Sequence, residues 1–279
     1  MDLERSVFTR LVGLGFKDHS LAANKLDASD WDSGINIANW PVFGMYQPDG
    51  LAAFQIQGVT YLVSANEGDT RDYSAYSEES RVRNLLLDPV SFPNAAVLQA
   101  NSNLGRLTVT SANGDVDLDG DYDQLFVPGT RSFSVWSDTG QLLFDSGDQL
   151  EQLIASAIPA HFNANNDAND FDSRSDNKGP EPEGLCLGKA YGRPYLFLGL
   201  ERVGGVVVYD LSEPTQPRLV QYLNNRDFSG DPEAGTAKDL GPEGLTFIHQ
   251  SESPTHTPLL VVANEVSGTT TIFEIVKVK

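Results

Sequence analysis

The stretch GPEPEGLCLG, Gly179–Gly188, contains Pro-Glu-Gly-Leu, and the same four residues return in GPEGLTFI, Gly241–Ile248. A third copy, QPDGLAAF at Gln47–Phe54, has Asp in place of Glu. Each copy stands directly before an apolar run, and a second acidic residue follows each copy at a similar distance. Such self-similarity indicates a fold that is built from repeated units.

The repeated unit consists of short apolar runs that are separated by turns. YLVSAN from Tyr61, YLFLGL from Tyr195 and LLVVAN from Leu259 follow the three motif copies. In two copies a further run follows in step, VVVYDL from Val206 and TTIFEI from Thr270. Runs of β-branched and aromatic residues between Gly, Pro and Asn or Asp turns predict antiparallel hairpins.

Repeats of about 40 to 50 residues, each forming a small antiparallel sheet, are typical of a β-propeller. The sequence therefore predicts an all-β protein, a propeller of four-stranded antiparallel blades. A fourth, divergent unit at residues 106–145 carries SFSVW where the other units carry VVVYD. A β-sandwich is the alternative, although its strands need not keep register with a repeated turn motif.

The predicted organisation is a lead-in at residues 1–47, whose apolar segment 7–16 could be the last strand of another blade. A helix is predicted at 149–162, because its apolar positions follow helical spacing, and a long polar loop at 163–182. Four units are few for a closed ring, so we expect a partial propeller, the carboxy-terminal blades of a longer domain whose amino-terminal blades are needed to close it. Blades are predicted within 48–279, at about 48–100, 104–147, 183–225 and 243–279.

Composition excludes several kinds of partner. The chain has 279 residues and a formal net charge of −20, which repels nucleic acid and anionic membranes. Cys186 is the only cysteine, so no intrachain disulfide can form, and its apolar surroundings favour a core position over a nucleophile. No run reaches the ~18 apolar residues of a membrane helix, and the amino-terminal sequence shows no signal peptide.

The repeated acids are the first candidate site. In a propeller the innermost strands begin at one rim of the central channel, so Asp49, Glu183 and Glu243 are expected to converge there. Converging carboxylates repel one another unless a cation neutralises them, and oxygen ligands favour Ca²⁺. Alternatively, each acid accepts hydrogen bonds from the backbone of its own turn. The second repeated set has the same two interpretations and consists of Glu67, Glu201 and Glu265.

An acidic stretch, DVDLDGDYD at 115–123, is the second candidate site. It follows the D-x-D-x-D-G pattern in which alternating carboxylates surround one Ca²⁺ and the glycine permits a sharp turn. The twelfth position is Phe126 rather than Glu, which excludes an EF-hand. A calcium-stabilised turn and a solvated acidic loop therefore both remain possible. The candidate ligands are Asp115, Asp117, Asp119, Asp121 and Asp123.

Catalytic patterns are scarce in this sequence. The four histidines are scattered without the spacing of zinc ligands, and neither G-x-S-x-G nor a Walker A motif is present. One loop combines Arg174 and Lys178 with Glu183, and such a group could grip a phosphate while a metal activates water. A salt-bridged surface loop is the alternative.

Several motifs together resemble the choice-of-anchor I domain family. They are SANEGDTRDY, DGDYDQL, GTRSFSVWSDTGQLLFDSGDQLEQL, FDSRSDNKGPEPEGL, GLERVGGVVVYDLSEP and DLGPEGL, and they run in order from about residue 15 to the end. The family consists of bacterial secreted or surface propellers whose members are often labelled alkaline phosphatase or mesenchyme-specific cell surface glycoprotein. The chain also resembles, more weakly, the esterase-like phytase propellers.

The resemblance implies a secreted, periplasmic or cell-surface module. Because no catalytic pattern stands out, a binding or scaffolding role is predicted, and the acidic residues predict bound Ca²⁺. Its partner would be an extracellular ligand. The alternative that it implies is a calcium-dependent phosphoesterase acting on a phosphoester substrate at the propeller channel, with Glu183, Arg174 and Lys178 as the candidate catalytic residues. The chain lacks the nucleophile and zinc ligands of ordinary alkaline phosphatases, which weakens the enzyme interpretation.

Overall fold

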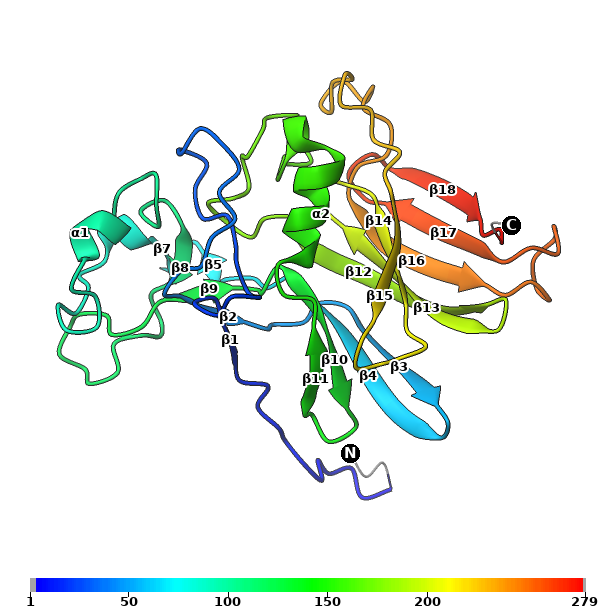
Figure 1. Ribbon diagram of the computed structural model, residues 1–279, viewed down its shortest axis with the longest axis horizontal. Helices are drawn as coiled ribbons and strands as arrows, with labels where there is room; N and C mark the ends of the chain where they lie inside the picture. The colour runs from blue at the N-terminus through cyan, green and yellow to red at the C-terminus, as the bar shows by residue number, and fades with distance from the viewer. Residues whose placement is uncertain (1–3, 278–279) are drawn as a thin grey trace.

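The computed structural model describes residues 4–277 and shows an all-β protein, as the sequence predicts (Figure 1). Among these residues, three antiparallel sheets each begin with one copy of the repeated motif, and we call them the motif sheets. The first contains β3 (Leu51–Ile56), β4 (Val59–Asn66), β10 (Ser132–Ser137) and β11 (Leu142–Asp145). The second contains β12 (Pro182–Ala190), β13 (Arg193–Leu200), β14 (Val206–Asp210) and β15 (Arg218–Leu223). The third contains β16 (Pro242–Ile248), β17 (Leu259–Asn264) and β18 (Thr269–Glu274).

The motif leucines occupy equivalent positions in the three sheets. Leu51 pairs with Ser64, Leu185 with Leu198, and Leu245 with Val262. Each of these partners stands three positions before the second acid of its repeat. The prediction that the three motifs begin equivalent strands is therefore confirmed.

The motif glycines let the first strands of neighbouring sheets approach closely. β12 lies against β3 and β4 on one side and against β16 on the other. A Cβ atom at Gly184 would overlap the backbone carbonyl of Glu243, and one at Gly50 would crowd that of Glu183. At Gly50 and Gly184 the glycine is thus required by contact between backbones, which any side chain would block, whereas Gly244 of the third sheet has no such contact.

The predicted separate blades at 48–100 and 104–147 are wrong. SFSVW forms β10, which pairs with β4 over its whole length, for example Val135 with Val63. β10 therefore occupies the third position of the first motif sheet, because the open edge of β4 needs a partner for its backbone groups. Residues 67–131 are an insertion between the second and third strands of that sheet.

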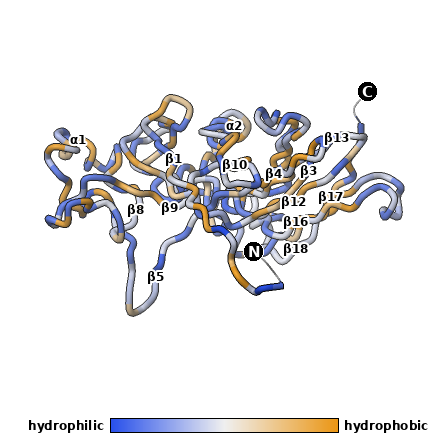
Figure 2. The backbone as a smooth tube through the Cα atoms, turned by 90° about the horizontal axis from the view of Figure 1, so that it is seen from below, coloured by the Kyte–Doolittle hydropathy of each residue, from blue (hydrophilic) through white to orange (hydrophobic). Residues whose placement is uncertain are grey.

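The insertion and the lead-in form a second lobe, on the left in Figure 1. Its core includes Leu26, Val42, Leu104 and Val109. A small sheet of order β1-β2-β9 has a parallel pair, β2 with β9, so the prediction of antiparallel blades does not extend to this lobe. Figure 2 shows the hairpin around β5 projecting from it. The elements are β1 (Phe16–Asp18), β2 (Phe43–Met45), β5 (Asp72–Tyr73), β6 (Tyr76–Ser77), β7 (Glu79–Arg81), η1 (Val82–Asn84), α1 (Ala95–Leu98), β8 (Thr108–Thr110) and β9 (Phe126–Pro128).

The predicted blade strand at residues 7–16 is also wrong. Only its last residue, Phe16, belongs to a strand, β1, and β1 pairs with β2. Phe8 and Leu11 are 84% and 98% exposed. Val7 forms an isolated bridge and residues 8–15 belong to no strand, because this stretch has no continuous partner for its backbone groups among the described residues.

The predicted helix is confirmed as α2 (Gln149–Ala157), which a short helix η2 (Pro159–His161) follows. Leu150 and Ile154 of α2 enter the main core, where they join Phe133 and Leu198 of the first two motif sheets. Residues 163–181 then form a loop without strands. This loop is packed although it is polar, because several of its polar side chains are buried, and these side chains build the sites described next.

Candidate functional site

Three pairs of carboxyl groups lie at the rim where β3, β12 and β16 begin. Within each repeat, the first acid faces the second acid of the same repeat. The carboxyl group of Glu183 interacts with that of Glu201, and the carboxyl group of Glu243 with that of Glu265. Oxygens of Asp49, Glu67 and Glu183 lie within 4.8 Å of one another, which joins the first pair to the second. The two repeated sets that the sequence singles out are therefore partners in pairs.

Two carboxyl groups that lie side by side repel each other when both are charged, and the pKa values reflect this. Burial, followed by the negative charges of Glu201 and Glu67, raises the pKa of Glu183 to about 9. The pKa of Glu243 is raised mainly by its hydrogen bond to Glu265. At neutral pH and without a cation, Glu183 therefore carries a proton.

An open cleft of about 750 Å³ adjoins the rim. It lies between the first strands of the three motif sheets and the outer part of the third sheet. Its acidic lining residues are Asp49, Glu243 and Glu265, and Leu185 and Leu245 supply apolar walls. Exposed carboxylates and a concave surface stand side by side there, an arrangement suited to a cationic ligand.

A buried ion network that the sequence analysis missed lies next to the rim, directly before β12. Its centre is Glu181, whose side chain is fully buried. Arg174, Lys178 and Arg202 all pair with Glu181, and Lys178 also pairs with Glu67. Although burial alone would raise the pKa of Glu181, the three cations lower it to about 2. The network holds the start of β12 in place, two residues before Glu183.

The candidate phosphate-binding cations belong to this network. Arg174 and Lys178 are largely buried, and both give their charge to Glu181 rather than to a group in the cleft. Glu183 is close to them in sequence but pairs with Glu201 instead. The arrangement is that of an internal salt-bridge network, and neither cation is free to grip a phosphate in it.

The acidic stretch 115–123 forms an exposed loop at the far end of the insertion lobe. Oxygens of Asp115, Asp117 and Asp123 lie within 4.8 Å of one another, and Asp121 and Asp123 form a second such group with Asp88. Asp88 carries no signal in the sequence pattern. Asp119 belongs to neither group, and its carboxylate accepts a hydrogen bond from the backbone N–H of Asp121. The loop can thus present three carboxylates to one ion, as a Ca²⁺ site needs.

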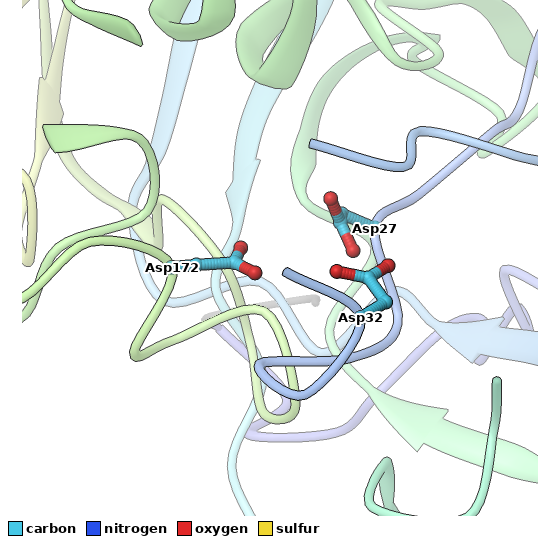
Figure 3. A group of neighbouring side chains, drawn as sticks. All are labelled: Asp27, Asp32 and Asp172. Carbon is cyan, nitrogen blue, oxygen red and sulfur yellow. The ribbon is translucent and has the colours of Figure 1, made fainter. Parts of the chain in front are cut away.

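A third acidic cluster consists of Asp27, Asp32 and Asp172, and Figure 3 shows their carboxylates pointing toward one another. One oxygen of each lies within 4.8 Å of the others. Burial raises the pKa of Asp27 to about 7, with a further contribution from the charge of Glu151, and burial raises that of Asp172 to about 8. The sequence analysis missed this cluster, because its members come from two loops outside the repeats.

None of the helices that the structure describes has the length and apolar character to cross a membrane.

A protein-family profile matches a large part of the chain. The profile of the choice-of-anchor I domain matches residues 1–214, more than half of the chain. The chain belongs to the choice-of-anchor I family. The resemblance predicted from the motifs is thereby confirmed. The match covers the insertion lobe and most of the first two motif sheets, whereas the third motif sheet lies beyond it.

Two animal proteins are similar to this chain in sequence. Gigasin-3a of Magallana gigas is 33% identical over 190 residues, which are 64% of this chain and 66% of that protein. The mesenchyme-specific cell surface glycoprotein of Strongylocentrotus purpuratus is 26% identical over 234 residues, 71% of this chain and 30% of that protein. The chain thus spans slightly less than two thirds of one relative and less than a third of the other.

Proposed function

We propose that the chain is a calcium-binding module of an extracellular or cell-surface protein, and that its ligand site is the rim with its carboxyl pairs. The observation that carries this proposal is the meeting of three carboxyl pairs, from equivalent positions in three sheets, beside an open cleft. Repetition alone would not bring both acids of a repeat together. A Ca²⁺ ion bound at the rim would be accessible from the cleft. It could therefore also bind an acidic group of a partner molecule, which would give the module its binding role.

The rim has the chemistry that Ca²⁺ requires. Carboxylate oxygens from different strands can surround a hard cation in a flexible geometry. Glu183 Oε2 is buried and accepts no hydrogen bond, so one oxygen in the centre of the rim lacks a partner. When Ca²⁺ binds, it would displace the proton that Glu183 holds, because a metal requires the deprotonated ligand.

The extracellular location rests on the family and on one relative's name, which includes the words cell surface glycoprotein. The net charge of −20 is compatible with it. Labelling of intact cells with an antibody against the chain, with and without permeabilisation, tests the location. Labelling that appears only after permeabilisation would contradict it.

We further propose that the motif sheets are consecutive blades of a propeller. Three features support this: their sequence order, the equivalent register of their first strands, and the close backbone approach at Gly50 and Gly184. An experimental structure of the full-length protein tests it. A ring of such sheets around one axis is expected, and a stack of sheets without a common axis would contradict it.

Calcium binding at the rim is tested by titration calorimetry on Glu183→Gln, in which the amide replaces the protonated carboxyl. Both this variant and its reference carry Asp117→Asn and Asp172→Asn, so that the other acidic clusters do not obscure the result. We expect the reference to bind Ca²⁺ with release of a proton, and Glu183→Gln to bind at least ~10-fold more weakly. The exposed Glu213→Gln serves as a matched control.

Equal affinity in the reference and in Glu183→Gln would remove the rim from consideration as a calcium site. Hydrolysis of p-nitrophenyl phosphate that depends on Ca²⁺ and that Glu183→Gln abolishes would replace the binding role by catalysis. The Ca²⁺ titration and the hydrolysis assay can be carried out on the same protein preparations.

A further inference from the structure

We propose that Asp27, Asp32 and Asp172 form a second, internal Ca²⁺ site, which ties the lead-in to the loop at residues 163–181. The site is independent of the rim and shares no residue with it. Its ligands come from two segments that are far apart in the sequence, and their carboxylates converge on one point (Figure 3). Asp27 is 0% exposed and Asp172 is 2% exposed, so the point lies inside the protein.

The cluster has no basic partner. Among residues 4–277, no Lys, Arg or His side chain forms an ion pair with any of the three carboxylates. The nearby Arg131 binds the carboxylate of Glu151 and the backbone carbonyls of Asp27, Ser175 and Asn177. Its donors are therefore already used.

Neighbouring acids in the same two segments do have basic partners. Asp30 pairs with Arg106, and Asp176 pairs with both Arg106 and Arg81. The fold thus supplies arginines to the acids on either side and none to the cluster itself. Buried carboxylates are otherwise paired or coordinate a metal, because an isolated buried charge is costly.

Unpartnered acceptor atoms are an independent indication of a bound ion. Asp32 Oδ2 is buried within the cluster and accepts no hydrogen bond, although Asp32 Oδ1 accepts one from Gly34 N–H. Asn163 is fully buried, and its Oδ1 also accepts none. Asn163 Nδ2 donates to Ser175 Oγ at 2.8 Å, and Ser175 Oγ donates to Asp172. Asp27 accepts hydrogen bonds from the backbone N–H groups of Ser29 and Asn36, so Asp32 Oδ2 is the buried oxygen of the cluster that has no donor, and a hard cation would supply its partner.

The position of the site gives it a structural role. Asp27 lies between Leu26 and Ala28, which belong to the core of the insertion lobe. Asp172 donates its backbone N–H to Phe162, which belongs to the main core beneath α2. An ion bound by both residues would join the two lobes, and the loss of the ion would weaken their junction.

Asp172→Asn is the variant that tests this site. Asp172 has a backbone φ of 68°, a conformation that Asn adopts nearly as readily as Asp. The amide oxygen can still accept the hydrogen bond from Ser175, so the variant should fold. Two measurements are made on wild type, Asp172→Asn and Glu183→Gln: the number of Ca²⁺ ions bound in equilibrium dialysis, and the melting temperature in Ca²⁺ and in EGTA.

We expect Asp172→Asn to bind one Ca²⁺ fewer than wild type. At a hundredfold excess over the Kd, this site should raise the melting temperature of wild type by roughly 5 °C, and Asp172→Asn should lose that part of the rise. In EGTA the variant should melt at about the wild-type temperature, because the amide replaces a carboxyl group that carries a proton when no ion is bound. Glu183→Gln should keep the part of the calcium-dependent rise in melting temperature that this site contributes. A failure of this proposal can therefore be told apart from a failure of the calcium site proposed at the rim.

Two results would overturn the proposal. One is an unchanged number of bound Ca²⁺ ions in Asp172→Asn together with the full calcium-dependent rise in melting temperature. The other is a variant that melts well below wild type in EGTA, since the carboxylate would then be stabilising without any ion. A rise that Mg²⁺ produces at the same concentration as Ca²⁺ would overturn the assignment to calcium.

Discussion

Two buried clusters of three carboxylates stand in this protein, and the fold treats them in opposite ways. Glu67, Glu181 and Glu201 are surrounded by three cations. The cluster of Asp27, Asp32 and Asp172 has none among the described residues. Burial acts on both clusters and by itself disfavours the charged form in each. The difference between them therefore arises from the neighbouring side chains.

This comparison shows how a cluster that stabilises the protein by itself differs from one that requires a ligand. In the first cluster the three cations converge on Glu181 and lower its pKa to about 2, so this carboxylate stays charged, although burial still raises the pKa of Glu67 to about 7 and also raises that of Glu201. In the second, the pKa values of Asp27 and Asp172 rise to about 7 and 8, because only a proton is present to neutralise them. A bound Ca²⁺ ion would neutralise these carboxylates in place of the proton and would leave them in their charged form.

Removal of Glu181 should have the largest effect on stability. Glu181→Gln leaves Arg174, Lys178 and Arg202 without their shared partner, and an uncompensated buried charge of this kind costs about 3–5 kcal/mol. The lowered pKa sets the pH dependence. The stabilisation is present above about pH 4.5, the ordinary pKa of Glu, and is lost as the pH falls toward 2. Urea denaturation at several pH values measures both.

The matched control for this experiment is Glu252→Gln, because Glu252 is exposed and lies away from the network. Its free energy of unfolding should stay within about 0.5 kcal/mol of wild type. If Glu181→Gln were as stable as this control at pH 7, the three cations would not depend on Glu181, and the contrast between the two clusters would fail.

The next prediction concerns the rim, where the contribution of Glu183 to the free energy of unfolding should depend on pH in the direction opposite to that of Glu181. In EGTA, the raised pKa of Glu183 means that its contribution is complete below about pH 4.5 and is lost as the pH rises through about 9. The free energy of unfolding should fall by at most about 1.4 kcal/mol per pH unit across that range, the limit for one proton. Glu183→Gln, which cannot ionise, should show a flatter profile.

Glu213→Gln is the control for the pH profile, and it should retain the wild-type slope. The profiles are measured by urea denaturation between pH 5 and 9 in EGTA, so that no cation competes with the proton. A Glu183→Gln profile as steep as that of wild type would assign the pH dependence to another group.

The sequence was sufficient to predict the repeated part of the fold. The motif predicted which strands begin equivalent sheets, because its glycine and leucine serve a contact that recurs in each sheet. It could not predict that SFSVW completes the first sheet. A third strand has the same alternation whether it follows its partner directly or after the insertion at 67–131, and only the pairing with β4 distinguishes the two cases.

The sites were predictable to the extent that they repeat. The six rim acids follow from the motif, although their pairing depends on strand register. Glu181 has no counterpart in the other copies, and its role depends on three cations that the loop at 163–181 and the turn after β13 bring together. Asp27 and Asp172 meet only through long-range packing of two irregular loops, a contact for which local sequence patterns contain no signal.

The acidic loop at 115–123 should show the smallest effect on stability, because water already screens its charges. Asp117 is exposed to solvent, and slight desolvation, followed by the negative charges of Asp119 and Asp123, raises its pKa. We expect Asp117→Asn/Asp119→Asn to leave the melting temperature in EGTA unchanged within error, since no buried charge is created or removed. If the loop binds Ca²⁺, the double variant should bind one ion fewer in equilibrium dialysis. The calcium-dependent rise in melting temperature should change little, because acids so close in the sequence can also bind the ion in the unfolded chain, and such binding cancels the stabilisation. A large loss of that rise would mean that an exposed loop stabilises the protein as strongly as the buried cluster, and burial would then not be what distinguishes the acidic clusters of this chain.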